Sequence, residues 1–310
     1  MTNTSNQEKV HSLTSLIDYY ALCNRAEGKS PRTITWYSAN LIRFHNYLKS
    51  RHLSDSIEKL DIKLLREYII YLLKRNKFEH HPYTPVQNEP LSITTVHGHA
   101  RTLRAFFSWL VREKLAETNI AKDLKPPKLT KKVVSTLSDE EILTILNTLN
   151  LHNHSQARNQ TILILLLDTG LRMGELVNFK MEDIHMDEGF LKVIGKGRKE
   201  RIVPMGSNTQ RALQRYLFRY RQKPACPEIN NAFLSIHREP LTENSIKLMF
   251  ARLARISGVS RLHAHLCRHT FATRFLINGG DVFTLQQILG HSTLEMVRRY
   301  ITLASSHVAI

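Results

Sequence analysis

The sequence predicts a mostly α-helical protein of two domains, with a small β-hairpin inside an α+β second domain. Three observations lead to this fold class. Apolar residues recur at helical spacing through most of the chain. Residues 190–205 form two apolar segments of strand length around a glycine-bearing turn. A basic, proline-containing stretch separates two helical regions, and 310 residues are enough for about two domains.

The first helical region, residues 1–118, has the pattern of a compact bundle. Leu13, Leu16, Ile17 and Tyr20 share one helical face. A second helix begins at Ser30-Pro31, because proline suits the first turn of a helix. Further helices are expected at about 62–74 and 93–114, and the polar, proline-containing residues 75–92 between them are expected to form a loop. We see no strand signal in this region, so four helices should make one domain.

Residues 119–135 are expected to be a basic linker, and residues 136–310 a second domain. The linker holds a Pro-Pro pair and five lysines, which favour an extended tether. The second domain opens with a capping box, in which Ser138 and Glu141 precede an apolar helix. An apolar helix at about 158–168 ends at Gly170, and the hairpin follows. More helices are expected at about 208–222, 243–256, 266–278, 282–289 and 293–301.

The charge balance points to a polyanionic partner. Lys plus Arg number 44 against 27 Asp plus Glu, a net charge of +17. Nucleic acid is the simplest partner for such a chain, although charge alone leaves an anionic membrane surface open. Apolar runs are too short for a membrane span, and the N-terminus has no signal-peptide pattern. Three cysteines, Cys23, Cys226 and Cys267, lie far apart, which predicts no disulfide framework and a cytoplasmic location.

Six charged or polar residues lie at positions that suggest a chemical role. They are Arg172 after a Gly turn, Lys196 at the hairpin tip, His265 and Arg268 one helical turn apart, His291 at the start of the final helix, and Tyr300 near its end. Each alone has an ordinary explanation. Arg172 could cap a helix or pair with Glu175, and Tyr300 could be a core aromatic. Only their combination argues for a site.

The sequence gives little support for a cofactor or a metal. Glycines 195 and 197 have no third glycine at dinucleotide-binding spacing, and the Gly-Lys-Ser at 28–30 lacks the first glycine of a Walker loop because position 23 is Cys. His263, His265, Cys267 and His269 fit no common zinc spacing. We therefore expect neither a cofactor nor a metal site.

Taken together, the six groups suit phosphoryl transfer. Two arginines can grip the oxygens of one phosphodiester and stabilise the charge of its transition state, in place of a metal. One histidine can move a proton and a second can donate to the phosphate. A lysine can protonate the leaving oxygen, and a tyrosine can attack phosphorus and hold the product covalently.

In this order and spacing, the groups resemble those of the tyrosine recombinases, the phage and transposon integrases and Xer-type resolving enzymes. That family's motif is Arg…Lys…His-x-x-Arg…His/Trp…Tyr. This chain has Arg172 in "TGLRMGEL", Lys196 in "GKGRKERIVP", His265 and Arg268 in "HLCRHTFAT", His291 in "LGHS", and Tyr300 nine residues later. The N-terminal half resembles the family's helical, SAM-like core-binding domain. The resemblance covers nearly the whole chain.

The resemblance implies a site-specific recombinase. It implies a clamp on double-stranded DNA at a specific core site, a 3′-phosphotyrosyl intermediate, a Holliday junction and a homotetramer on synapsed DNA. Integration or excision of a mobile element is the expected biology, with Xer-type dimer resolution as the alternative. A directionality factor or a second recombinase would be further partners.

The chain departs from the family pattern at two places, and two other classes of protein remain as alternatives. Ile301 and Thr302 stand where many members have Thr-His, and the loop 75–92 is longer than in the simplest members.

A metal-dependent nuclease or transposase would need clustered carboxylates, which we do not find, and a chelator would identify it. A DNA-binding protein without catalysis would fail to form a covalent adduct.

Overall fold

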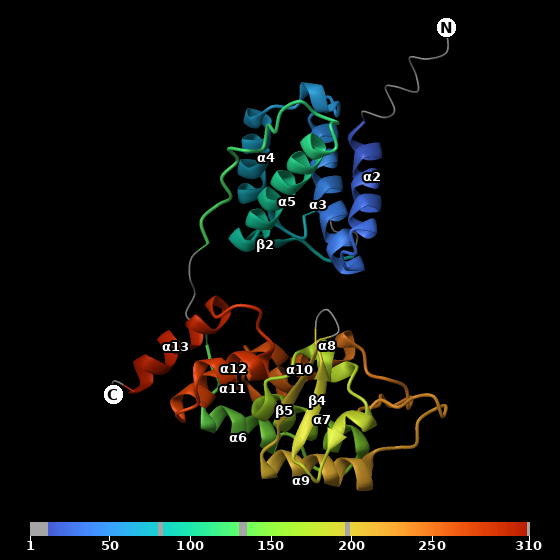
Figure 1. Cartoon of the computed structure of the whole chain (residues 1–310), viewed down its shortest axis with the longest axis vertical. Coiled ribbons are helices and arrows are strands. Elements are labelled where there is room, and N and C mark those ends of the chain that lie inside the picture. Colours follow the sequence, from blue (N-terminus) through green and yellow to red (C-terminus); the bar gives the residue numbers. More distant parts are fainter. Residues whose placement is uncertain (1–11, 80–82, 130–134, 196–198, 309–310) are drawn as a thin grey trace. The chain divides into compact units, whose positions relative to one another are not determined.

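The computed structural model describes residues 12–79, 83–129, 135–195 and 199–308, with side chains as far as Ile301. The chain divides into two compact units, Met1–Lys131 and Lys132–Ile310 (Figure 1). Within the described residues, no helix combines the length and apolar character that a membrane crossing requires.

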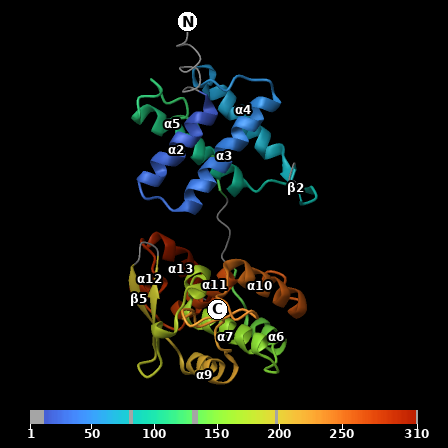
Figure 2. The same ribbon diagram turned by 90° about the vertical axis from the view of Figure 1, so that its right-hand side faces the viewer.

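The first unit is a helical bundle whose helices all begin at a side-chain cap. It contains α2 (Leu13–Ala26), α3 (Pro31–Ser50), α4 (Ile62–Lys74) and α5 (Ile93–Arg112) (Figures 1 and 2). Ser12, Ser30, Asp61 and Ser92 each accept a hydrogen bond from the backbone N–H three residues later. Such caps satisfy N–H groups that have no partner inside the helix. The predicted helices are therefore confirmed, with boundaries set by these caps.

The interior of this bundle is strongly aromatic and apolar. Its largest buried members include Phe44, Tyr68, Phe106 and Phe107. Ala121 and Leu124, which lie in the segment expected to be a linker, are also buried in this core. A short 3-10 turn, η1 (Ile57–Lys59), precedes α4. The expectation of a strandless loop at 75–92 was wrong, because β1 (Asn76–Lys77) pairs there with β2 (Gln87–Pro90).

The second unit is built around a central helix. The capping box of Ser138 and Glu141 starts α6 (Asp139–Asn147), as expected. The central helix, α7 (His154–Thr169), packs against helices on two sides and is followed by a short helix, α8 (Met173–Val177). Gly170 ends α7 at φ +60°, and a Cβ there would lie 2.5 Å from the Phe271 ring. Only glycine suits this turn, which leads directly to Arg172.

A three-stranded antiparallel sheet covers one side of this unit. The predicted hairpin is confirmed as β4 (Phe190–Ile194) and β5 (Glu200–Pro204), paired in register from Phe190 opposite Pro204 to Ile194 opposite Glu200. The sequence analysis missed β3 (Ile184–His185), which follows the 3-10 turn η2 (Met181–Asp183) and pairs with β4. Two residues are too few to show an alternating pattern.

The remaining helices complete the unit. The helix expected at 208–222 is α9 (Ser207–Arg215) followed by a π-helical turn, η4 (Tyr216–Tyr220). Next come α10 (Glu243–Ser257), α11 (Ala264–Ile277) and α12 (Val282–Leu289). The last helix, α13 (Glu295–Val308), is longer than expected and packs against α11 and α12. The main core lies between α7, the sheet, α10 and α11.

Candidate active site

Arg172 lies in the turn between α7 and α8. Its backbone N–H donates to Oε2 of Glu175, and its Nη1 donates to Oε1, both at 2.8 Å. Its Nη2 donates to the carbonyl oxygen of Gly290 at 2.9 Å. The side chain therefore joins the start of α8 to the residue that ends α12. The pairing with Glu175, which the sequence left open as an ordinary explanation for Arg172, is present alongside this second anchor.

Arg268, on α11, is only 1% exposed. Its Nη1 donates to the carbonyl oxygen of Gly170 at 2.6 Å, and its Nη2 to that of Leu289 at 2.8 Å. Burial, followed by the positive charge of Arg172, lowers the pKa of Arg268 to about 9. The guanidinium is therefore still a cation at neutral pH. Both arginines are attached to the turns that end α7 and α12.

His291 follows the left-handed turn at Gly290, where φ is +61°. Its Nε2 lies 2.9 Å from Nη2 of Arg268. A guanidinium can only donate, so Nε2 accepts and the ring carries its proton on Nδ1. Burial, then the charges of Arg268 and Arg172, lower the pKa of His291 to about 3, which keeps the ring neutral. In the part of the chain described, its buried Nδ1 has no hydrogen-bond partner.

Two further histidines lie on the same helix as Arg268. His265 and His269 contact each other edge to face, with ring centroids 4.6 Å apart. Burial, then the charge of Arg268, lowers the pKa of His265. Burial, then His265, lowers the pKa of His269 to about 4. Both rings are therefore neutral at neutral pH.

Tyr300, on α13, is a core residue in this structure. It is 1% exposed and packs with Ala272, Leu285, Leu289 and Val297. Its hydroxyl lies 2.9 Å from Nδ1 of His269. Burial raises the pKa of Tyr300, and the charge of Arg299, whose guanidinium lies 5.8 Å from the ring centroid, opposes that rise. A neutral phenol and a neutral imidazole therefore share this hydrogen bond, and the tautomer of His269 decides which of them donates.

The structure brings most of the predicted groups together. Arg172, Arg268 and His291 meet at the turns ending α7 and α12. The Tyr300 hydroxyl contacts His269, which the sequence analysis had considered only as part of an unconvincing zinc cluster. Lys196 lies outside the described residues. The hairpin beside it is closed by the N–H of Gly195, which donates to the carbonyl of Lys199 at 2.8 Å.

Sequence reasoning missed Arg201. Its Nη1 and Nη2 donate to Oε1 and Oε2 of Glu175 at 2.9 and 2.8 Å. A signal was present, because Arg201 stands two residues before Val203 and therefore on the same, inward face of the strand. A charged residue on that face needs a partner.

The groups considered for zinc have other roles. Nδ1 of His263 accepts the N–H of Leu266 at 3.0 Å and so caps α11. Cys267 is fully buried, and burial raises the pKa of its thiol to about 12. Among the residues that the structure describes, no three His, Cys, Asp or Glu side chains are grouped closely enough to hold a metal ion.

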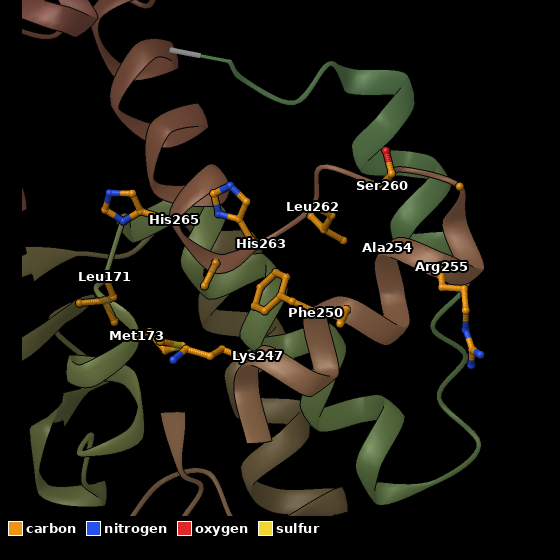
Figure 3. A pocket seen from close by; sticks show the side chains of 13 residues that line it. Leu171, Met173, Lys247, Phe250, Ala254, Arg255, Ser260, Leu262, His263 and His265 are labelled. Carbon is orange, nitrogen blue, oxygen red and sulfur yellow. The ribbon is translucent and has the colours of Figure 1, made fainter. Parts of the chain in front are cut away.

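A pocket of about 750 Å³ borders the site at His265 (Figure 3). Leu171, Phe250, Ala254 and Leu262 supply much of its apolar lining. Lys247 and Arg255 add positive charge, and His263 stands beside His265 at one side in the close-up. The pocket is therefore an apolar hollow with cationic groups, next to Leu171 and the Arg172 turn.

Two anchored arginines, neutral histidines and a tyrosine, in a helical unit with a small sheet, are the features expected of a tyrosine-type DNA strand transferase. Comparison with known proteins agrees. Residues 135–307 match the model of the phage integrase family, and residues 12–126 match the phage integrase SAM-like domain. The chain belongs to the phage integrase family, the tyrosine recombinases, whose members are site-specific DNA recombinases.

Relatives and solved structures extend over nearly the whole chain. Tyrosine recombinase XerD of Staphylococcus aureus strain Mu50 is 29% identical over 297 residues, covering 95% of this chain and 96% of the relative. Tyrosine recombinase XerC of Staphylococcus carnosus is 31% identical over 274 residues, covering 87% and 86%.

The similar solved structures include XerH bound to its palindromic difH substrate, with TM-score 0.73, 21% identity and coverage of 96% and 83%. The Tn1549 transposon integrase in complex with circular intermediate DNA has TM-score 0.71, 20% identity and coverage of 94% and 95%. These two likenesses show that the fold is shared.

Proposed function

We propose that this recombinase cuts and rejoins DNA at a core site through a covalent bond between Tyr300 and a 3′-phosphate. The observation that carries the proposal is the cluster of Arg172, Arg268 and His291, with Tyr300 packed nearby on α13. The six residues singled out in the sequence are its proposed catalytic groups, with Lys196 assigned from the sequence alone.

The arginines would hold the scissile phosphate. A guanidinium has five N–H groups. Arg172 uses two in side-chain hydrogen bonds to Glu175 and Gly290, and Arg268 directs three toward Gly170, Leu289 and His291. Among the described residues no partner is seen for the remaining N–H groups, which we propose donate to phosphate oxygens. Because Arg268 is 1% exposed, the residues that cover it must move for the phosphate to reach it. Preorganised donors of this kind stabilise charge that develops in a transition state, without a metal ion.

The histidines would act as neutral groups around that phosphate. His291 offers an Nδ1–H that has no acceptor among the described residues, which suits donation to a phosphate oxygen. His265, held neutral beside Arg268, suits acceptance of a proton from the nucleophile.

The chemistry balances without an added cofactor. The Tyr300 oxygen forms a bond to phosphorus as its proton passes to a histidine, and the bond from phosphorus to the 5′ oxygen breaks. Lys196 would give that oxygen a proton. Because the hydroxyl is buried against His269, Tyr300 must exchange this hydrogen bond for the phosphate before it attacks. The 5′-hydroxyl of a partner strand reverses the steps, so bond energy is conserved.

Duplex DNA is the proposed partner. The net charge of +17 suits phosphate contacts, which supply most of the affinity for DNA. Homologous solved structures include XerH on difH and λ integrase on a core site. Exchange through a Holliday junction would require four protomers on two duplexes, and a directionality factor or a second recombinase would be further partners.

The proposed biological reaction is integration or excision of a mobile element, which suits a family named for phage integrases. Resolution of chromosome or plasmid dimers is the second candidate, favoured by the XerD and XerC relatives. Deletion of the gene separates the two. Loss of a circular element junction supports the first, whereas accumulation of chromosome dimers supports the second.

The experiment that tests the proposed reaction is recombination by the purified protein. Its core site is first recovered by selecting bound sequences from a randomised duplex library. A supercoiled plasmid with two such sites is then incubated without ATP and with EDTA. We expect rearranged plasmid and transient Holliday junctions. Free double-strand ends without rejoining would instead indicate a nuclease.

A further inference from the structure

Arg201 is a charged residue on the inner face of a strand. It lies in β5, two residues before the fully buried Val203, and its side chain is 12% exposed. The strand packs against α12, and the two lie side by side in Figure 2. A cation in such a position is stable only when its hydrogen bonds are satisfied.

The guanidinium of Arg201 is held at three points. Two parallel hydrogen bonds, 2.9 and 2.8 Å long, join it to the two carboxylate oxygens of Glu175. Its Nε donates to the carbonyl oxygen of Ile288 at 2.7 Å. The paired geometry fixes the plane of the carboxylate as well as its position. Arg201 therefore joins β5 to α8 and to the last turn of α12.

The carboxylate that Arg201 holds is the one that holds Arg172. Glu175 is 6% exposed on its side chain, and it also accepts the backbone N–H and Nη1 of Arg172 at 2.8 Å. Burial raises the pKa of Glu175, but the hydrogen bond and charge of Arg201, with help from Arg172, outweigh burial and lower it overall. The carboxylate stays ionised between the two cations.

Two glycines lie directly against Arg201. A Cβ on Gly195 would lie 3.3 Å from its Nη1, and a Cβ on Gly290 would lie 3.3 Å from its Cδ and Nη1. Gly195 precedes Lys196 in the chain, and Gly290 precedes His291. A side chain at either position would therefore crowd the guanidinium, which through Glu175 also fixes Arg172.

We propose that Arg201 is a positioning residue for catalysis, which sets Arg172 through Glu175 and holds the end of α12, ahead of His291, through its hydrogen bond to Ile288. This inference rests on the proposed function. It assigns Arg201 no contact with DNA and no proton transfer. Its role is to hold three separate chain segments, β5, the start of α8 and the end of α12, in one arrangement.

The conservative variant Arg201→Lys tests the role, because an ammonium keeps the charge but cannot form the paired bonds to Glu175 and the bond to Ile288 together. Arg221→Lys is the matched control. Arg221 also binds backbone through its guanidinium, with bonds of 3.1 Å to Ala232 and 2.8 Å to Asn231. The full-length proteins are compared for Tm, for DNA affinity, and for the rate of covalent adduct formation on a nicked core-site duplex with protein in excess.

We expect Arg201→Lys to slow adduct formation by about 10²-fold, the cost of misplacing reacting groups by about 1 Å, with DNA affinity unchanged. Arg221→Lys should keep the wild-type rate even if its Tm falls equally. Because Arg201 acts through Glu175, the double variant Arg201→Lys with Glu175→Gln should form the adduct much faster than the product of the two single rate losses would give.

The outcomes separate this inference from the reaction itself. An Arg201→Lys protein that cleaves as fast as the Arg221→Lys control overturns the positioning role while the proposed function stands. If the rate loss of the double variant equals the product of the two single losses, Arg201 does not act through Glu175. A wild-type protein that forms no adduct overturns the proposed function, and this inference with it.

Discussion

The hydroxyl of Tyr300 lies 2.9 Å from Nδ1 of His269, in the packed region between α13 and α11. Burial raises the pKa of Tyr300 and lowers that of His269 to about 4, so a neutral hydroxyl and a neutral ring share this hydrogen bond. A neutral phenol is a weak nucleophile. This hydrogen bond therefore holds the proposed nucleophile in an unreactive, buried position that reaction with DNA must undo.

His269→Ala should loosen α13. Removing the imidazole takes away the hydrogen-bond partner of the buried Tyr300 hydroxyl, which costs about 1–3 kcal/mol. Hydrogen exchange of the backbone amides of residues 295–301 measures the result, and we expect faster exchange than in the wild type. Exchange in α10 should be unchanged.

The control for this prediction is the Tyr300→Phe background. Without the hydroxyl, His269→Ala has no bond to remove, so the double variant should exchange at the rate of Tyr300→Phe alone. Equal exchange of α13 amides in the wild type and His269→Ala would show that the bond does not hold the helix.

Arg172→Ala should slow DNA cleavage by about 10²-fold or more, as the loss of a preorganised charge contact does. Wild-type cleavage should persist in excess EDTA, because the two arginines are proposed to stabilise the charge of the transition state in place of a metal ion. The rate of adduct formation, with and without EDTA, measures both the loss in Arg172→Ala and the metal independence of the wild type. Cleavage lost to EDTA and restored by magnesium would contradict the metal-free mechanism. Retained activity in Arg172→Ala would leave Arg172 only its structural contacts to Glu175 and Gly290.

Lys196→Ala should lose about 10² to 10⁴-fold in cleavage of normal DNA, the usual range for a general acid. A substrate with sulfur in place of the 5′-bridging oxygen should restore most of that loss, because a thiolate leaves without protonation. Arg172→Ala should show no such recovery and serves as the control. If Lys196→Ala is equally slow on both substrates, Lys196 is a phosphate contact and Lys199 becomes the next candidate.

Stability should fall in mild acid. The pKa of His291 is about 3 and that of His269 about 4 in the folded protein, against about 6.5 in an unfolded chain. Between these values the unfolded chain binds more protons, so the free energy of unfolding decreases as pH falls from about 7 toward 4. Urea unfolding at pH 7 and pH 5 measures this. His291→Gln should reduce the difference in the free energy of unfolding between pH 7 and pH 5. His237→Gln, at an exposed position, should leave that difference as in the wild type. The same difference in the wild type and both variants would contradict the buried, neutral state of His291.

Much of the fold was predictable because its elements carry local signals. The side chains of Ser30, Ser92 and Ser138 cap the helices that they precede. Residues 190–205 contain two apolar segments around a glycine-bearing turn, a local pattern that predicts the hairpin. The strands that were missed, β1, β2 and β3, have only two, four and two residues. Their pairing depends on distant backbone, and four exposed residues such as 87–90 carry no apolar period.

The site was predictable as a set of residue types but not as a set of contacts. Spacing along the chain identifies Arg268 and His291 as candidates, but their 2.9 Å approach depends on how α11 and α12 pack. The contact between Tyr300 and His269 likewise requires the packing of α13 on α11. Arg201 was overlooked because its partner Glu175 lies on another element, although its inward register on β5 was a usable signal.

The most direct test of the account is covalent trapping at Tyr300. A duplex with a nick beside the scissile phosphate releases a short strand after cleavage, so that rejoining is prevented and the adduct accumulates. We expect the wild-type protein to form a DNA adduct whose peptide map places the 3′-phosphate on Tyr300. Tyr300→Phe, which removes only the hydroxyl, should bind the same duplex and form no adduct. An adduct formed by Tyr300→Phe, or one mapped to another residue, would contradict the central claim.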